Sequence, residues 1–218
     1  MLTLGLNFAT EDLCLAVAGL GGATPTVEKK YRGQTIKAEH LPDYLDELFR
    51  ASQTSLAEIS RLGIAIGPGA FTGLRLSLVT AKTIALALHI PLVPVSTLEA
   101  LAAQYQPEAA GRNIHVIMDT CRGESAAALF DNGGARLEVD QVIGSADVRR
   151  ARENLLIENR PADALSVCRL AARAEVVFDR AEILRMTPRY SHASRVNLTA
   201  KPELQHLQIA QKIHPNPE

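Results

Sequence analysis

The stretch LGIAIGPGAFTGLR, residues 62–75, decides the fold class of this chain. Apolar Leu62 to Ile66 predicts a buried strand, and Gly67 to Gly73 predicts a glycine-rich turn that leads into a long helix over Thr72 to Leu88. A strand that passes through a tight turn into a helix is typical of α/β proteins. The free amide groups at the start of such a helix also form a ready anion site.

The spacing of the glycines excludes two common phosphate loops. A dinucleotide loop, G-x-G-x-x-G, needs glycine where this chain has Thr72, and the pattern G-x-x-x-x-G-K-[ST] is absent. Two interpretations of the turn stay open. Either it binds a phosphate group, or Gly69 and Gly73 let the helix pack closely on the sheet, which the stiffening effect of Pro68 favours.

A meander of three strands precedes this unit, and a second one follows it. The first is predicted at Leu2 to Leu6, Leu13 to Val17 and Val27 to Tyr31, and the second at Ile114 to Met118, Ala126 to Phe130 and Arg136 to Val142. Polar tips at 6–12 and 118–124 join the first two strands of each meander. The repeated order indicates a duplication that gives two mixed sheets with helices on their faces.

The second copy is shorter than the first. A helix is expected around Ala146 to Arg152 and another over Ala162 to Ala174, followed by a brief strand at Val176 to Phe178. Ser96 caps a further helix through Leu98 to Gln104, after the strand Leu92 to Val95.

Two helices of the first half are candidates for a protein interface. Leu41, Tyr44, Leu45, Leu48 and Phe49 recur at the spacing of one helical face. The helix over Thr72 to Leu88 is apolar on nearly all sides, so the sheet, the preceding helix or another chain must cover it. Its two charges, Arg75 and Lys82, fit either a solvated surface or the margin of a subunit interface.

Composition excludes several classes of protein. Lys plus Arg (23) and Asp plus Glu (24) nearly cancel, which argues against an autonomous nucleic-acid binder. Aromatic residues are only 4%, so stacking sites have little to build on. Cys14, Cys121 and Cys168 are too few and too dispersed for a disulfide framework or a zinc site. No signal peptide and no membrane span are expected, which favours a cytoplasmic protein.

Catalytic and metal-binding patterns are also missing from the sequence. The six histidines are His40, His89, His115, His192, His206 and His214, and none is paired at i, i+4. Neither H-E-x-x-H nor G-x-S-x-G occurs. We therefore predict no catalytic residue and no metal site.

Residues 62–75, continued through Ala81-Lys82 to PLVPVSTLEALA at 91–102, closely resemble the TsaB (YeaZ) family of bacterial tRNA threonylcarbamoyladenosine synthesis. Weaker similarity extends over most of the chain. It lies at Ala9-Thr10-Glu11, Leu41-Pro42, Asp119 with Arg122-Gly123-Glu124, and Pro188-Arg189-Tyr190.

The resemblance implies an α/β protein with the actin-like ATPase (ASKHA) fold, made of two ribonuclease H-like lobes of which the second is reduced. We place the lobes at 1–106, with the interface helices, and 107–200, followed by a flexible tail over 201–218.

The resemblance also implies a function. Members of the family are non-catalytic subunits that pair with a homologous catalytic subunit, TsaD, and work with an ATPase, TsaE. The assembly attaches a threonylcarbamoyl group to adenosine next to the anticodon, so this chain would meet tRNA only through the complex, and alone it could form a homodimer. Pairing through the glycine-turn helix and the helix before it implies an interface of Leu41, Tyr44, Leu45, Leu48, Phe71, Thr72, Gly73, Arg75, Leu76, Val79 and Lys82.

The resemblance also implies candidate positions for a nucleotide. The positions that could bind nucleotide are Asn7, Thr10, Gly67, Gly69 and Asp119, yet the family usually has Asp where this chain has Asn7 and a small residue where it has Phe8. A neutral amide is a poor magnesium ligand. ATP or ADP at the subunit interface stays open. The alternatives are a nucleotide-dependent kinase or hydrolase of the same fold, or a glycoprotease-like peptidase, which would need the H-x-x-x-H helix that this chain lacks.

Overall fold

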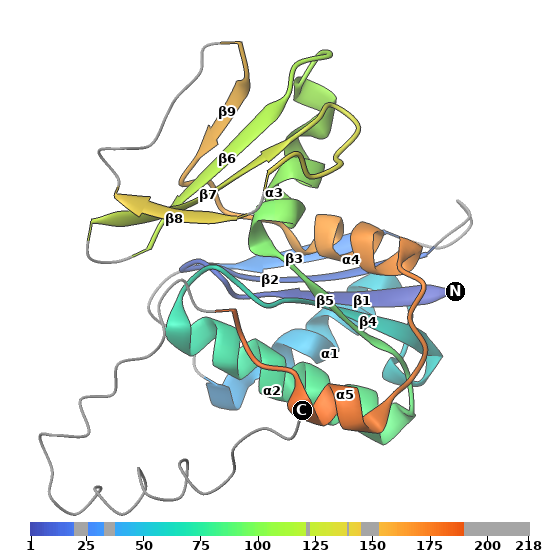
Figure 1. Ribbon diagram of the computed structural model, residues 1–218. Coiled ribbons are helices and arrows are strands. Elements are labelled where there is room, and N and C mark those ends of the chain that lie inside the picture. The colour runs from blue at the N-terminus through green and yellow to red at the C-terminus, as the bar shows by residue number, and fades with distance from the viewer. Residues whose placement is uncertain (20–25, 33–37, 121–122, 139, 145–152, 190–218) are drawn as a thin grey trace, which may run out of the picture.

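The computed structural model describes residues 1–19, 26–32, 38–120, 123–138, 140–144 and 153–189. These residues form two β-sheets with helices on their faces (Figure 1). The first sheet has the strand order β3-β2-β1-β4-β5, and the second has the order β8-β7-β6-β9. The strands are β1 (Leu2–Asn7), β2 (Leu13–Gly19), β3 (Val27–Tyr31), β4 (Ile59–Ala65), β5 (Leu92–Val95), β6 (Ile114–Asp119), β7 (Glu124–Phe130), β8 (Gln141–Gly144) and β9 (Leu155–Glu158).

The second sheet repeats the strand pairing of the first. β1 pairs antiparallel with β2 and parallel with β4, and β2 pairs antiparallel with β3. In the same way β6 pairs antiparallel with β7 and parallel with β9, and β7 pairs antiparallel with β8. The duplication predicted from the two meanders is thus present in the structure.

Helices cover both faces of the first sheet. α1 (Leu41–Ser52) and α2 (Phe71–Leu88) pack on one face, and α4 (Ala164–Arg173) packs on the other. α3 (Thr97–Tyr105) packs against β6 and against α4, so that α3 and α4 lie between the two sheets (Figure 1). α5 (Arg180–Arg185) packs against α2. The chain that follows β9 therefore returns to the first sheet.

Short 3-10 turns precede α1, β4 and the second meander. They lie at Ala38–His40, Leu56–Glu58 and Gln106–Glu108. In the turn before β4, Ser55 N donates to Glu58 Oε2 at 2.7 Å, which is the glutamate half of a capping box.

Two glycines let α4 lie directly on the sheet. Gly5 in β1 and Gly63 in β4 are paired neighbours in the parallel ladder. A Cβ atom added at Gly5 would lie 2.5 Å from the Ala164 carbonyl oxygen, and one at Gly63 would lie 2.7 Å from Ala171 Cβ. Any larger residue at either position would push α4 away from the sheet.

The strand expected over Arg136 to Val142 is shorter than its sequence predicts, since β8 begins only at Gln141. The Arg136 guanidinium forms ion pairs with Glu99 of α3, at 2.9 Å, and with Asp140. The ion pair with Glu99 thus ties the segment before β8 to α3, and Arg136 makes an isolated bridge to Phe130 of β7.

The prediction of a strand at Val176 to Phe178 is wrong. This segment has no regular secondary structure, because it leads from α4 to α5 along the surface of the first lobe. Arg61 of β4 donates to the Ala171 carbonyl at 2.9 Å and also to the Ala174 carbonyl. The Phe178 ring packs edge-on against His89, with 5.3 Å between ring centroids. The helix expected around Ala146 to Arg152 lies outside the described residues, as does the tail over 201–218.

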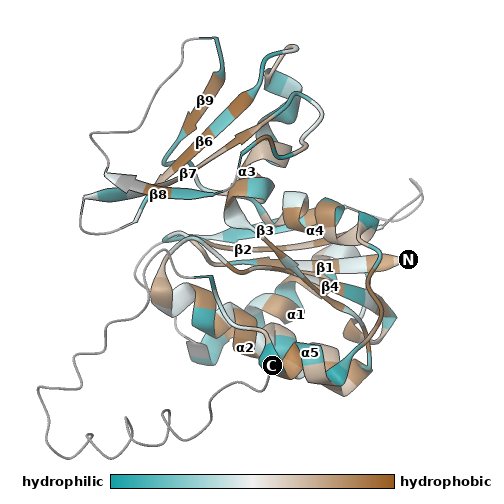
Figure 2. Cartoon of the chain, viewed as in Figure 1, coloured by the Kyte–Doolittle hydropathy of each residue, from teal (hydrophilic) through white to brown (hydrophobic). Residues whose placement is uncertain are grey.

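α2 is long and apolar enough, by length and composition alone, to cross a membrane. In the fold it packs against β4, β1 and α5. Leu74, Ala81 and Ala85 on its inner face are fully buried, as in the core helix of a globular domain. Figure 2 shows apolar residues along α2, interrupted by a few hydrophilic ones.

Candidate functional site

The outer side of α2 presents apolar groups to solvent. Its inner face buries Gly73, Leu74, Ser77, Leu78, Ala81, Ile84 and Ala85. On the outer side, Val79 is 63% exposed and Phe71 is 45% exposed, and Thr72 and Thr83 are exposed as well. Thr72, Val79 and Thr83 fall on one stripe of the helix, with half-buried Leu76 beside them. We call Thr72, Leu76, Val79 and Thr83 the α2 ridge.

α1 contributes less free apolar surface than the sequence predicts. Leu41 is 3% exposed and Leu48 is fully buried, so both belong to the core rather than to a surface. Tyr44 and Leu45 are half-buried. The Tyr44 ring packs on Tyr31 of β3, with 4.1 Å between ring centroids. Of the four α1 residues predicted at an interface, only Tyr44 and Leu45 are thus partly accessible.

Charged residues line this layer of helices. The exposed positions of α1 include Asp43, Asp46 and Glu47, with Arg50 in an ion pair to Asp46 at 2.5 Å. On α2, the Arg75 guanidinium lies over the Phe71 ring, 3.8 Å from its centroid. α1 thus presents charged groups of both signs to solvent, and α2 presents the exposed Arg75.

Lys82 has a structural contact that the sequence did not reveal. Its Nζ donates to the Leu184 carbonyl oxygen at 2.9 Å. A cation at the last turn of a helix interacts favourably with the free carbonyl groups there. Lys82 therefore holds the end of α5 against α2, and Leu184 itself is 56% exposed beside this contact.

The glycine turn is filled by the tip of the first meander. Ala70 N donates to the Ala9 carbonyl at 2.6 Å. A Cβ atom at Gly69 would lie 2.7 Å from Ala9 Cβ, and one at Gly73 would lie 3.0 Å from Phe8 Cγ and closer still to the Phe8 carbonyl oxygen. The two glycines thus serve close packing, as the sequence favoured, although their neighbour is the β1–β2 tip rather than the face of the sheet.

The two tip residues, Asn7 and Asp119, have different surroundings. Asn7 is 1% exposed, and its Oδ1 accepts a hydrogen bond from Ala9 N at 3.0 Å. Asp119 is exposed at the second tip, and its two oxygens accept from Ser125 Oγ and from Asn159 Nδ2, each at 2.8 Å. Asn159 also accepts from the Asp119 amide at 2.7 Å. Asp119 thus belongs to a separate polar cluster of the second lobe.

The other residues predicted to bind nucleotide lie near Asn7. Thr10 is half-buried in the same tip, and Gly67 is buried at the start of the turn. A Cβ atom on Gly67 would meet the Arg189 carbonyl, and Arg189 N donates to the Ile66 carbonyl at 2.7 Å. The described C-terminal segment therefore covers this end of the turn.

No group of three or more His, Cys, Asp or Glu side chains suited to a metal ion comes together within the described ranges. Cys14 and Cys168 are free and buried. Burial raises the pKa of the Cys14 thiol to about 12 and also raises the pKa of Cys168. Both thiols are therefore protonated and unreactive at neutral pH.

Comparison with solved structures defines the class of protein. The chain is similar to YeaZ from Pseudomonas aeruginosa, with a TM-score of 0.74 and 20% identity, over 87% of this chain and 99% of that one. A second structure, described as similar to peptidase YeaZ from the same organism, gives a TM-score of 0.75 over 88% of this chain. The protein has the mixed α/β actin-like (ASKHA) fold with two ribonuclease H-like sheets.

Sequence comparison identifies the family. A model described as "TsaD: tRNA N6-adenosine threonylcarbamoyltransferase" matches residues 20–186. The tRNA threonylcarbamoyladenosine biosynthesis protein TsaB of Bacillus subtilis is 32% identical over 165 residues, and that of Escherichia coli is 31% identical over 102 residues. The chain belongs to the TsaB (YeaZ) family.

Those alignments cover 73% and 47% of this chain, and 64% and 43% of the Bacillus subtilis and Escherichia coli relatives. The chain thus spans roughly two-fifths to two-thirds of the length of these curated relatives.

Proposed function

We propose that this chain is a non-catalytic partner subunit in the synthesis of threonylcarbamoyladenosine on tRNA. It pairs with a TsaD-like catalytic subunit, and the pair works with a TsaE-like ATPase in the cytoplasm. Membership of the TsaB family supports this role. The observation that carries the pairing is the α2 ridge, in which Val79, 63% exposed, and half-buried Leu76 present apolar groups between Thr72 and Thr83.

The contacts of the described residues refine the interface that the sequence predicted. The accessible candidates are Tyr44, Leu45, Phe71, Thr72, Arg75, Leu76 and Val79. Leu41, Leu48 and Gly73 are buried, so they shape the surface rather than contribute to it. Lys82 lies at the margin, where it holds α5. Interfaces of this kind have an apolar centre and a polar rim, so we expect Leu76 and Val79 near the centre and Arg75 at the margin.

Contact with tRNA is expected only through the complex. The formal charge of the whole chain is −1, and a protein that binds nucleic acid alone needs a clustered positive surface. The catalytic subunit would then carry the main contacts with tRNA.

Association in solution tests the pairing. Purified chain is mixed in equal amounts with the TsaD-like subunit from the same genome, and the mass of the product is measured by size-exclusion chromatography with light scattering. We expect one species with the summed mass of one copy of each chain. Two separate peaks at micromolar concentration would rule out the pairing. A homodimer peak for the chain alone that disappears on mixing would support a shared surface.

A further inference from the structure

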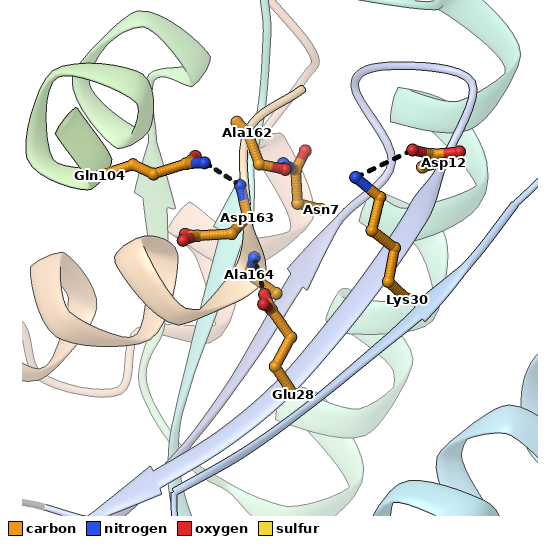
Figure 3. A network of polar contacts seen from close by, with 8 residues as sticks. All are labelled: Asn7, Asp12, Glu28, Lys30, Gln104, Ala162, Asp163 and Ala164. Atoms are coloured by element: carbon orange, nitrogen blue, oxygen red, sulfur yellow. Dashed lines mark hydrogen bonds and ion pairs between the residues drawn. The ribbon is translucent and has the colours of Figure 1, made fainter. Parts of the chain in front are cut away.

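The segment that leads from β9 to α4 is held by side chains from three different elements (Figure 3). Asn7 of β1 donates from Nδ2 to the Ala162 carbonyl at 2.6 Å. Gln104 of α3 accepts from the Asp163 amide at 2.9 Å. Glu28 of β3 accepts from the Ala164 amide at 2.7 Å and from the Leu165 amide at 3.2 Å. We call residues 162–165 the crossover; they are the last two residues of this segment and the first two of α4.

These contacts connect the two lobes. Asn7 and Glu28 belong to the first sheet, whereas Gln104 lies on α3, which packs against β6 of the second sheet. All three side chains lie within residues 1–106 and bond to the main chain of the crossover, which follows β9 of the second sheet. These bonds therefore tie the chain that leaves the second sheet to the first lobe. Asp163 adds a local cap to α4, since its Oδ1 accepts from Ser166 N at 2.7 Å.

The contact of Asn7 requires an amide. A carboxylate has no proton to donate to the Ala162 carbonyl, and its charge would be repelled by that oxygen. Asn7 is 1% exposed, and its two polar atoms are both used, one by Ala162 and one by Ala9. Glu28 approaches the free amide groups at the start of α4. Burial raises the pKa of this carboxyl, and Asp163 raises it further, against the opposing effect of the two amides and of Lys30.

The nucleotide and magnesium ion implied by an actin-like ATPase fold do not fit these residues. The Asn7 amide is occupied by the protein itself, and both oxygens of Asp119 accept hydrogen bonds within the second lobe. The β1–β2 tip packs against Gly69 and Gly73, where a phosphate group would have to approach the glycine turn.

We propose that Asn7, Glu28 and Gln104 form a latch that fixes the two lobes relative to each other, beside the β1–β2 tip where the fold would otherwise place a nucleotide. The latch keeps the α1 and α2 layer on a rigid body without a bound ligand. This role is independent of which partner the α2 ridge contacts.

Amide hydrogen exchange measured by NMR tests the latch. Asn7→Asp removes the hydrogen bond to the Ala162 carbonyl. The acceptors of the Asp163, Ala164 and Leu165 amides are on other residues and stay in place. Faster exchange at these three amides therefore reports opening of the crossover as a unit. We expect exchange to rise by about threefold to tenfold, the range given by the loss of one hydrogen bond. Asn7→Ala, which introduces no charge, should show the same rise.

Two neighbouring glutamines provide matched variants. Gln104→Ala should speed exchange at Ala164 and Leu165 as well as at Asp163, whereas Gln104→Glu keeps an acceptor and should restore protection. Gln106→Ala removes a similar bond, from Nε2 to the Asn132 carbonyl at 3.0 Å, without touching the crossover, and should leave its exchange unchanged. The latch is refuted if Asn7→Asp and Gln104→Ala leave the Ala164 and Leu165 amides as protected as in the wild type. Slower exchange over 7–10 and 67–73 on addition of ATP and magnesium would show that a nucleotide binds beside the β1–β2 tip. That result would refute the claim that these residues do not fit a nucleotide.

Discussion

Replacing Val79 by glutamate is expected to weaken pairing with the TsaD-like subunit strongly while the isolated chain stays folded. Val79 is 63% exposed at the middle of the α2 ridge, so the folded chain accommodates a charge there. In the complex the same charge would be buried without a partner, and buried unpaired charges are strongly unfavourable. We expect affinity to fall by at least about thirtyfold, equivalent to the 2 kcal/mol that marks an interface hot spot. Isothermal titration calorimetry measures the dissociation constant.

Val177→Glu is the matched control for this variant. Val177 is 81% exposed, lies in the segment between α4 and α5 and takes the same substitution. It should pair with wild-type affinity. Equal dissociation constants for the wild type and Val79→Glu would show that the α2 ridge lies outside the interface, whatever else the chain binds.

Placing even a methyl group on Gly73 is expected to destabilise the fold severely. A Cβ atom there would lie 3.0 Å from Phe8 Cγ and closer still to the Phe8 carbonyl oxygen, which is backbone and cannot move without shifting the β1–β2 tip. Overpacking of a tightly packed site costs about 1–3 kcal/mol and occasionally more. We expect Gly73→Ala to lower the free energy of unfolding by about 3 kcal/mol, measured by chemical denaturation.

Thr72→Ala serves as the control for Gly73→Ala. Thr72 is the adjacent residue in the first turn of α2 and its side chain is exposed, so its truncation should change the unfolding free energy by less than about 0.5 kcal/mol. Similar stability for Gly73→Ala and the wild type would contradict the close packing of the tip on the turn. Because Gly73 is interior, a larger substitution such as Gly73→Glu tests the fold and is unsuited to probing the interface.

The regular parts of the fold could be predicted because their signals are local. Two meanders with polar tips indicated the two sheets, and β3 and β5 have the predicted bounds. The spacing of Leu41, Tyr44 and Leu48 indicated α1. Ser96 precedes α3, where Glu99 Oε2 accepts from its amide at 3.4 Å, so the start of α3 was also visible in the sequence.

Features that depend on distant residues escaped prediction. α5 is six residues long, and it depends on the Asp179 cap, on burial of Ile183 and on Lys82 from α2. The apolar run at Val176 to Phe178 indicated a strand, yet it lies beside Arg61 and His89 with no strand as a partner.

The surroundings of Asn7 could be predicted only in part. The neutral charge of Asn7 argued against a magnesium site from sequence alone. Its contact with Ala162, 155 residues away, depends on the return of the chain from the second lobe to the first. In the same way, Gln104 and Glu28 carried no recognisable motif, because their partners are main-chain amides of the crossover. The latch could have been predicted only if the packing position of α4 had been known.

Reconstitution of tRNA modification tests the proposed function most directly. The TsaD-like and TsaE-like proteins, the threonylcarbamoyl donor, ATP and tRNA are combined with and without this chain, and threonylcarbamoyladenosine is quantified by mass spectrometry of digested tRNA. A partner subunit predicts product only when the chain is present, with Val177→Glu active and Val79→Glu inactive. Equal product when the chain is omitted would contradict the proposed role.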